Sequence, residues 1–163
     1  MSDKREALPI HPVPVETSAT VRVRGLVENP LTLETSDLAR FPHITLVDDF
    51  TCVEGWSVPA LEWQGPALTG VVRLARPRPE ASYVTVAAAD FATSVPLSDV
   101  LDGAGLLALY LGGEPLSRTH GGPCRLILPG QACFTSIKWV DRIELTDTPM
   151  NSSERIALAR LSR

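Results

Sequence analysis

A single cysteine stands where a strand-like run of the sequence meets a turn, a position at which a thiol can do chemistry. Cys52 follows the segment 44–51, which is rich in β-branched and apolar residues, and precedes Glu54, Gly55 and Trp56. Four roles are open to such a cysteine: core packing, half of a disulfide, a nucleophile, or a thiolate ligand of a metal. Residue type alone favours packing.

The cysteine count narrows these roles. The chain has three cysteines, which are widely spaced and include no C-x-x-C pair: Cys52, Cys124 and Cys133. An odd, scattered set fits neither a disulfide framework nor a zinc cluster. We therefore expect at least one free thiol, and we interpret Cys124 and Cys133 as small buried hydrophobic residues.

Two polar, turn-rich segments downstream carry groups that hold an anion. They are residues 112–125, GGEPLSRTHGGPCR, and residues 129–138, PGQACFTSIK. Arg125 presents a planar fork of donors, Lys138 a point charge and Ser136 a hydroxyl, which together predict a phosphate cradle. The alternative is that both cations are solvated surface charges.

His120 stands in the first of these segments, beside a glycine pair. Gly121 and Gly122 allow the backbone to approach a bound molecule closely. The ordinary interpretation of His120 is a surface or structural histidine, and the alternative is a ligand contact. Another hypothesis is a hydrolase that uses Cys52 and His120, and it requires the imidazole of His120 within about 3 Å of the sulfur of Cys52.

Strands and short helices must position these loops. The residue pattern predicts strands over 21–27, 44–51, 83–88, 125–128 and 137–145. It predicts helices over 36–40, capped by Thr35 or Ser36, and over 68–75, 97–101 and 153–161. Residues 106–111 fit either a helix or a buried strand. This irregular interleaving favours an α+β fold with a mixed sheet, short helices and irregular loops.

Composition bounds the class of protein. The 163 residues are 44% hydrophobic and 21% charged, which predicts one globular domain over 20–148 with an N-terminal arm, 1–19, and a C-terminal tail, 149–163. A formal charge of −4 without a basic stripe argues against nucleic acid as a partner. We expect no transmembrane segment and, because residues 1–6 do not resemble a signal peptide, a cytoplasmic location; export with a partner or a missing precursor segment stays open.

Seven short blocks occur in the order and at the spacing of a known family. They are TCVEGWS from Thr51, WQGPAL from Trp63, YVTV from Tyr83, SVPL from Ser94, GGEPL from Gly112, HGGPCRLILPG from His120 and SIKWVDRIEL from Ser136. With them, residues 20–146 resemble the molybdopterin-binding domain of the sulfite oxidase family. The resemblance implies the fold of that domain and a molybdenum-molybdopterin cofactor.

The resemblance also implies roles for individual residues. Cys52 matches the cysteine thiolate that ligates molybdenum, a soft donor suited to a redox-active metal. His120 matches a pterin contact. Arg125, Ser136 and Lys138 match the residues that hold the cofactor's phosphate, in agreement with the anion cradle inferred from their chemistry.

The residues after Cys52 depart from the sulfite-oxidising members, which carry a glycine, an asparagine and arginines there. Glu54 and Trp56 would instead line the approach to the metal, and the loss of positive charge disfavours sulfite. The string CVEGWS is closer to the branch that contains the catalytic subunit of methionine sulfoxide reductase. We therefore expect a metal-binding oxidoreductase that transfers an oxygen atom to or from a sulfoxide- or N-oxide-like substrate.

Electron transfer in such a domain requires a separate partner, because the sequence shows no haem-binding motif. The resemblance implies a haem- or quinone-linked partner. A rival hypothesis is a non-catalytic molybdopterin-binding or interaction domain of the same fold. The presence of Cys52 argues against this rival, because a scaffold alone does not require a thiol there.

Overall fold

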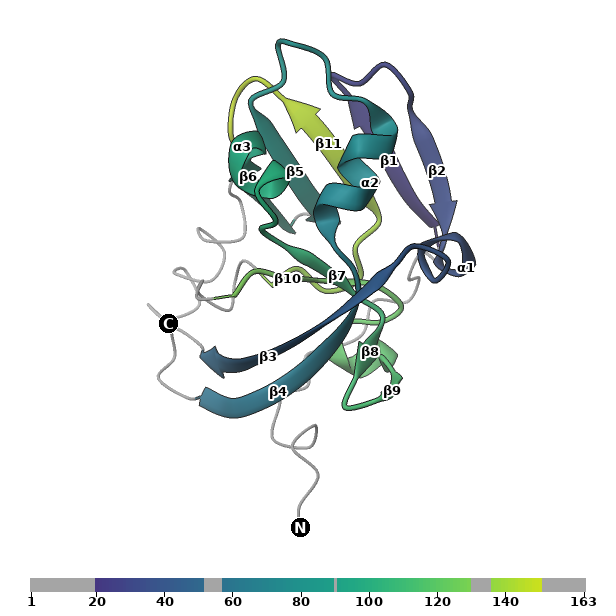
Figure 1. Ribbon diagram of the computed structural model, residues 1–163, viewed down its shortest axis with the longest axis vertical. Coiled ribbons are helices and arrows are strands. Elements are labelled where there is room, and N and C mark those ends of the chain that lie inside the picture. Colours follow the sequence, from purple (N-terminus) through teal and green to yellow (C-terminus); the bar gives the residue numbers. More distant parts are fainter. Residues whose placement is uncertain (1–19, 52–56, 90, 130–135, 151–163) are drawn as a thin grey trace.

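The computed structural model describes residues 20–51, 57–89, 91–129 and 136–150, whose strands form three sheets (Figure 1). The largest sheet has five strands in the order β2-β1-β11-β5-β6. Strands β1 and β11 run parallel, and its other neighbouring pairs are antiparallel. The strand bounds are Thr20–Gly25 (β1), Leu31–Glu34 (β2), Tyr83–Ala88 (β5), Phe91–Pro96 (β6) and Arg142–Thr146 (β11).

Alternating residue types decide which face of this sheet is buried. Val21 and Val23 of β1 are 2% and 1% exposed, whereas Arg22 between them is exposed, because successive side chains of a strand point to opposite faces. Helices α2 (Leu68–Ala75) and α3 (Leu97–Leu101) pack on the apolar face, and Figure 1 shows α2 lying across the sheet. The main hydrophobic core lies between these helices and the sheet.

Of the residues singled out above, Arg125 lies on one of two smaller sheets, and residues 52–56 connect two strands of the other. One has the order β3-β4-β8-β9, and the other pairs β10 with β7. Gly65 lets β4 approach β7 closely, because a side chain there would collide with the carbonyl of Leu107. The strand bounds are His43–Thr51 (β3), Ser57–Pro66 (β4), Leu106–Ala108 (β7), Tyr110–Leu111 (β8), Glu114–Pro115 (β9) and Arg125–Ile127 (β10).

Most of the elements predicted from the sequence are confirmed. Strands β1, β3, β5 and β10 and helices α2 and α3 occupy the predicted segments, and the ambiguous run 106–111 forms strands β7 and β8. Helix α1 (Thr35–Leu38) is confirmed, but its predicted cap is wrong. Glu34 is the N-cap, and its N–H donates to the Asp37 carboxylate at 2.9 Å.

The predicted strand over 137–145 is too long. Strand β11 begins only at Arg142, because Trp139 adopts a left-handed backbone conformation with φ of 55° that no strand accommodates. Strands β2, β4, β6 and β9 were not predicted. Strand β4 contains Pro59, Gly65 and Pro66, which are typical of turns, so its sequence conceals a long antiparallel partner of β3.

The predicted terminal helix over 153–161 and the N-terminal arm lie outside the described residues. Among the helices that the structure describes, none has the length and apolar character needed to cross a membrane.

Candidate functional site

Arg125 is the most deeply buried cation of the described residues. It begins strand β10 opposite Ala108 of β7, and only 4% of its surface is exposed. Its Nη1 donates to the carbonyl oxygen of His120 at 2.9 Å, and its Nε donates to Oγ of Ser136 at 3.2 Å. Burial lowers the pKa of Arg125 to about 9, which leaves the guanidinium charged at neutral pH.

Trp63 supplies one wall beside this guanidinium. The guanidinium carbon of Arg125 lies 5.2 Å from the centre of the Trp63 ring, close enough for a cation–π interaction. Trp63 is 1% exposed and comes from the middle of β4. The chain therefore places an aromatic face against a buried positive charge.

Ser136 joins Arg125 to the neighbouring backbone. Its hydroxyl accepts from Arg125 Nε and donates to the carbonyl of Leu126 at 2.9 Å. The segment that follows runs beside β10, because the N–H of Leu126 donates to Ile137 and the N–H of Val140 donates to Cys124, each at 2.9 Å. This pairing brings Lys138 to the same place as Arg125.

Lys138 is partly buried next to a like charge. Its Nζ donates to the carbonyl of Thr119 at 3.3 Å and lies 5.6 Å from the centre of the Trp139 ring. Burial, and then the positive charge of Arg125, lower the pKa of Lys138 to about 8. Within the described residues, no carboxylate pairs with Lys138. A bound anion would relieve this repulsion.

The loop over 117–122 closes around the two cations. It contains a short 3₁₀ helix, η2 (Arg118–His120), for which Ser117 is the N-cap. Gly121 follows with φ of 102°, and a Cβ there would lie 2.8 Å from Cγ of Lys138 and 3.1 Å from Cδ of Arg125. Glycine is therefore required both by the backbone conformation and by the close approach to the cations.

The structure thus brings together four residues that the sequence singled out: His120, Arg125, Ser136 and Lys138. We call this group, with Gly121, the cation cradle. His120 contributes its carbonyl oxygen to Arg125, while its Nδ1 lies 2.9 Å from the hydroxyl of Ser117.

The predicted metal ligand Cys52 and its neighbours Glu54 and Trp56 lie outside the described residues, as does Cys133. Residues 52–56 connect β3 to β4, whose ends pair at Thr51 and Ser57. Because Cys52 is not among the described residues, the Cys52–His120 hydrolase stays a hypothesis. Cys124 is 1% exposed, and burial raises its pKa to about 12, so its interpretation as a small buried hydrophobic residue is confirmed.

Two tryptophans at the cradle were missed as site residues. Trp63 was named above only as part of the block WQGPAL, and Trp139 lay only within the block SIKWVDRIEL and the predicted strand over 137–145. No spacing rule links either residue to a cation, because the contacts depend on how β4, β10 and the segment after Ser136 meet in space.

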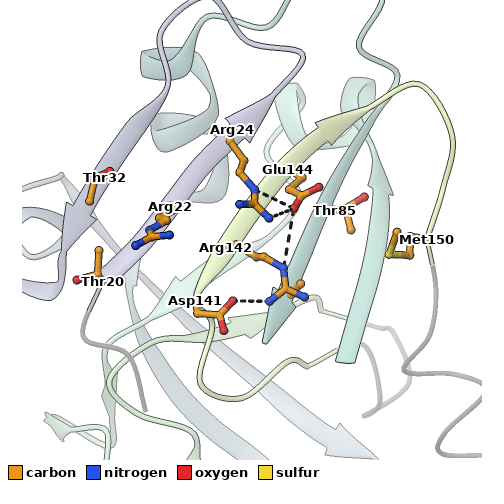
Figure 2. A pocket seen from close by; sticks show the side chains of 10 residues that line it. Thr20, Arg22, Arg24, Thr32, Thr85, Asp141, Arg142, Glu144 and Met150 are labelled. Atoms are coloured by element: carbon orange, nitrogen blue, oxygen red, sulfur yellow. Dashed lines mark hydrogen bonds and ion pairs between the residues drawn. The ribbon is translucent and has the colours of Figure 1, made fainter. Parts of the chain in front are cut away.

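A separate hollow of about 810 Å³ lies on the polar face of the five-stranded sheet (Figure 2). Arg24 and Arg142 on this face pair with Glu144, and Arg142 also pairs with Asp141 at 2.8 Å. None of the cradle residues lines this hollow. Two of its three arginines are paired with carboxylates, whereas no carboxylate among the described residues pairs with Lys138 of the cradle, so the cradle is the better candidate for an anion.

Comparison with known proteins identifies the family of this chain. The model of a family described as the oxidoreductase molybdopterin binding domain matches residues 10–154. The chain is 36% identical over 131 residues to the uncharacterized oxidoreductase YuiH of Bacillus subtilis, which covers 80% of the chain and 66% of YuiH. It is 30% identical over 167 residues to MsrP of Gluconobacter oxydans, the catalytic subunit of a protein-methionine-sulfoxide reductase, which covers 90% of the chain and 52% of MsrP.

A solved structure has the same fold. The sulfane dehydrogenase SoxCD from Paracoccus pantotrophus superimposes with a TM-score of 0.76 at 28% identity, over 86% of this chain and 42% of that one. The predicted α+β molybdopterin-binding fold is therefore confirmed. The chain spans less than two thirds of the length of each of these three proteins. It belongs to the oxidoreductase molybdopterin binding domain family, in which the cofactor is molybdenum bound to molybdopterin.

Proposed function

We propose that this domain catalyses oxygen-atom transfer on a small substrate, sulfoxide- or N-oxide-like rather than sulfite. The observation that carries the proposal is the cation cradle, in which the charge of Arg125 acts on Lys138 and Gly121 of the loop over 117–122 lies close to both side chains. Two like charges in partly or fully buried positions are costly unless an anion binds between them. The residues present thus fit a cofactor that ends in a phosphate.

In this proposal the cradle holds the far end of the cofactor. Arg125 and Lys138 would bind its phosphate through charge-assisted hydrogen bonds, and the loop around His120 and Gly121 would lie against the pterin. Ser136 would orient Arg125, to which it is already bonded. When bound, the cofactor supplies the redox chemistry, including the exchange of an oxygen atom with the substrate.

Residues 52–56 would form the other end of the site. Cys52 would supply the thiolate ligand of the metal, as its place in the family motif implies, and Glu54 and Trp56 would line the approach. An anionic Glu54 repels sulfite but tolerates a neutral sulfoxide. The similarity to MsrP, named for its reduction of protein methionine sulfoxide, supports the same substrate class.

The reaction in this direction consumes electrons and protons. A sulfoxide takes up an electron pair and two protons and leaves as a thioether and water. The electrons would come from a separate haem- or quinone-linked protein. This partner, like the substrate, is part of the proposal.

Metal analysis and turnover together test the function. We expect protein from a host that makes molybdopterin to contain molybdenum near one atom per chain. With reduced viologen, it should turn over methionine sulfoxide or an N-oxide. Cys52→Ser should abolish turnover yet retain much of the pterin, because the cradle is intact. Wild-type protein that lacks molybdenum under these conditions would refute the proposal.

The non-catalytic alternative predicts a different pattern. A domain that only binds the cofactor would contain molybdopterin but turn over no member of a panel of sulfoxides, N-oxides, nitrate and sulfite. In that case Cys52→Ser would change no measured rate. Pterin content without turnover would therefore favour the binding role.

A further inference from the structure

Trp139 has a backbone conformation that its side chain disfavours. Its φ of 55° lies in the left-handed region, where a bulky residue is rare and costs conformational energy. Glycine, or asparagine, would adopt this conformation more readily. The surrounding contacts must therefore hold Trp139 in place.

Two hydrogen bonds join Trp139 to the loop over 117–122. The indole Nε1 of Trp139 donates to the carbonyl of Arg118 at 2.7 Å, and its backbone N–H donates to the carbonyl of Gly121 at 2.9 Å. The side chain and the backbone of Trp139 thus form hydrogen bonds to both ends of the stretch 118–121. That stretch includes Thr119, which accepts the hydrogen bond from Lys138.

The ammonium group of Lys138 lies between the ring of Trp139 and the loop over 117–122. Its Nζ is 5.6 Å from the centre of the Trp139 ring on one side and 3.3 Å from the Thr119 carbonyl on the other. An aromatic face and a carbonyl oxygen hold an ammonium group without neutralising its charge. A carboxylate in their place would hold Lys138 equally well but would remove the attraction for an anion.

We propose that Trp139 is a positioning residue, which fixes Lys138 and the loop over 118–121 in the geometry that receives the cofactor's phosphate. The inference rests on the proposed function, because it concerns the same anion site. It adds that the left-handed turn at Trp139 serves binding, and that the indole N–H and the ring act at different points. The N–H holds the loop, and the ring holds the ammonium.

A purely structural role for Trp139 makes a different prediction. The residue also packs against the main core, so its replacement lowers stability in either case. If packing were its only role, a destabilising substitution elsewhere in the core would also weaken binding. Ile143→Val provides that control, because Ile143 is fully buried on β11 and is not part of the cradle.

Two substitutions separate the indole from the backbone. Trp139→Phe keeps an aromatic face but removes the N–H that binds Arg118. Trp139→Gly accommodates the left-handed backbone without strain, so the chain can fold while the whole side chain is absent. Both variants, the wild type and Ile143→Val would be prepared with and without cofactor.

The first readout is the pterin content of protein from a molybdopterin-producing host. The second is the affinity of the cofactor-free protein for inorganic pyrophosphate, measured by calorimetry at pH 7. We expect Trp139→Phe to lose a few-fold in pyrophosphate affinity and Trp139→Gly about tenfold or more, with pterin content falling in the same order. Ile143→Val should match the wild type in both.

The outcomes keep the two proposals apart. Wild-type affinity and pterin content in Trp139→Gly would overturn the positioning role, as would an equal loss in Ile143→Val, and neither result bears on the function of the domain. Wild-type protein that binds pyrophosphate but never acquires pterin would refute the proposed function. The pyrophosphate affinities of the variants would then decide the role of Trp139 by themselves. Failure of the wild type to bind either would overturn both.

Discussion

The guanidinium of Arg125 lies over the indole ring of Trp63, with 5.2 Å between the guanidinium carbon and the ring centre. The two residues come from different sheets, Arg125 from β10 and Trp63 from β4. Strand β4 is also the strand that follows the connection containing Cys52. The contact therefore links the strand next to the predicted metal ligand with the predicted phosphate anchor.

Replacing Trp63 should weaken this link in two separable ways. Trp63→Phe keeps an aromatic face over Arg125 and should cost roughly 1–3 kcal/mol of stability through lost volume and imperfect packing. Trp63→Leu also removes the cation–π contact, worth about 2 kcal/mol when it is desolvated. We expect pterin content to fall further in Trp63→Leu than in Trp63→Phe. Equal pterin contents in the two variants would show that the ring face does not support Arg125.

Arg125→Lys should show that the fork of donors matters as well as the charge. A lysine keeps the charge but cannot bond both the His120 carbonyl and Ser136 in one plane. We expect pterin content to fall at least tenfold while the melting temperature falls by only a few degrees. Arg22→Lys is the matched control, because Arg22 is exposed on the polar face of the five-stranded sheet. A similar loss in the control would show that the effect does not depend on the cradle.

Sequence reasoning predicted the cradle better than the scaffold that builds it. Arg125, Ser136 and Lys138 were singled out by their hydrogen-bonding chemistry, which left solvated surface charges as the alternative, and then by the resemblance to a known family. The role of Trp63 could not be predicted, because it depends on β4 meeting β10, and β4 itself is hidden by prolines and a glycine. Trp139 was assigned to a strand, since alternation of residue types does not reveal a left-handed backbone.

Gly121→Ala tests the close approach of the loop to the cations. The substitution combines an unfavourable φ of 102° with a Cβ placed 2.8 Å from Cγ of Lys138. Gly103→Ala is a close match for the first effect alone, since Gly103 has φ of 109° and no atom within 4 Å of the added Cβ. We expect about 1 kcal/mol of destabilisation in Gly103→Ala and roughly twice that in Gly121→Ala, by chemical denaturation. Only Gly121→Ala should lose pterin, and normal loading of that variant would contradict the cradle.

The pH dependence of the cofactor-free protein should separate stability from binding. The pKa of Lys138 is lowered from 10.5 to about 8 in the folded chain, first by burial and then by Arg125. Between these values the unfolded chain binds more protons than the folded chain, so the free energy of unfolding should rise with pH. The affinity for pyrophosphate should fall over the same pH range, because the ammonium group of Lys138 begins to lose its charge near pH 8.

Arg125 contributes in the same direction, but only above about pH 9, the value to which burial lowers its pKa. Lys138→Met removes the contribution of Lys138 to both the stability and the affinity. In this variant the rise in stability and the fall in affinity between about pH 8 and 9 should both disappear, measured by denaturation and by calorimetry across pH 7–10. If the wild type binds pyrophosphate equally well at pH 7 and pH 9.5, Lys138 does not carry the charge that holds the anion.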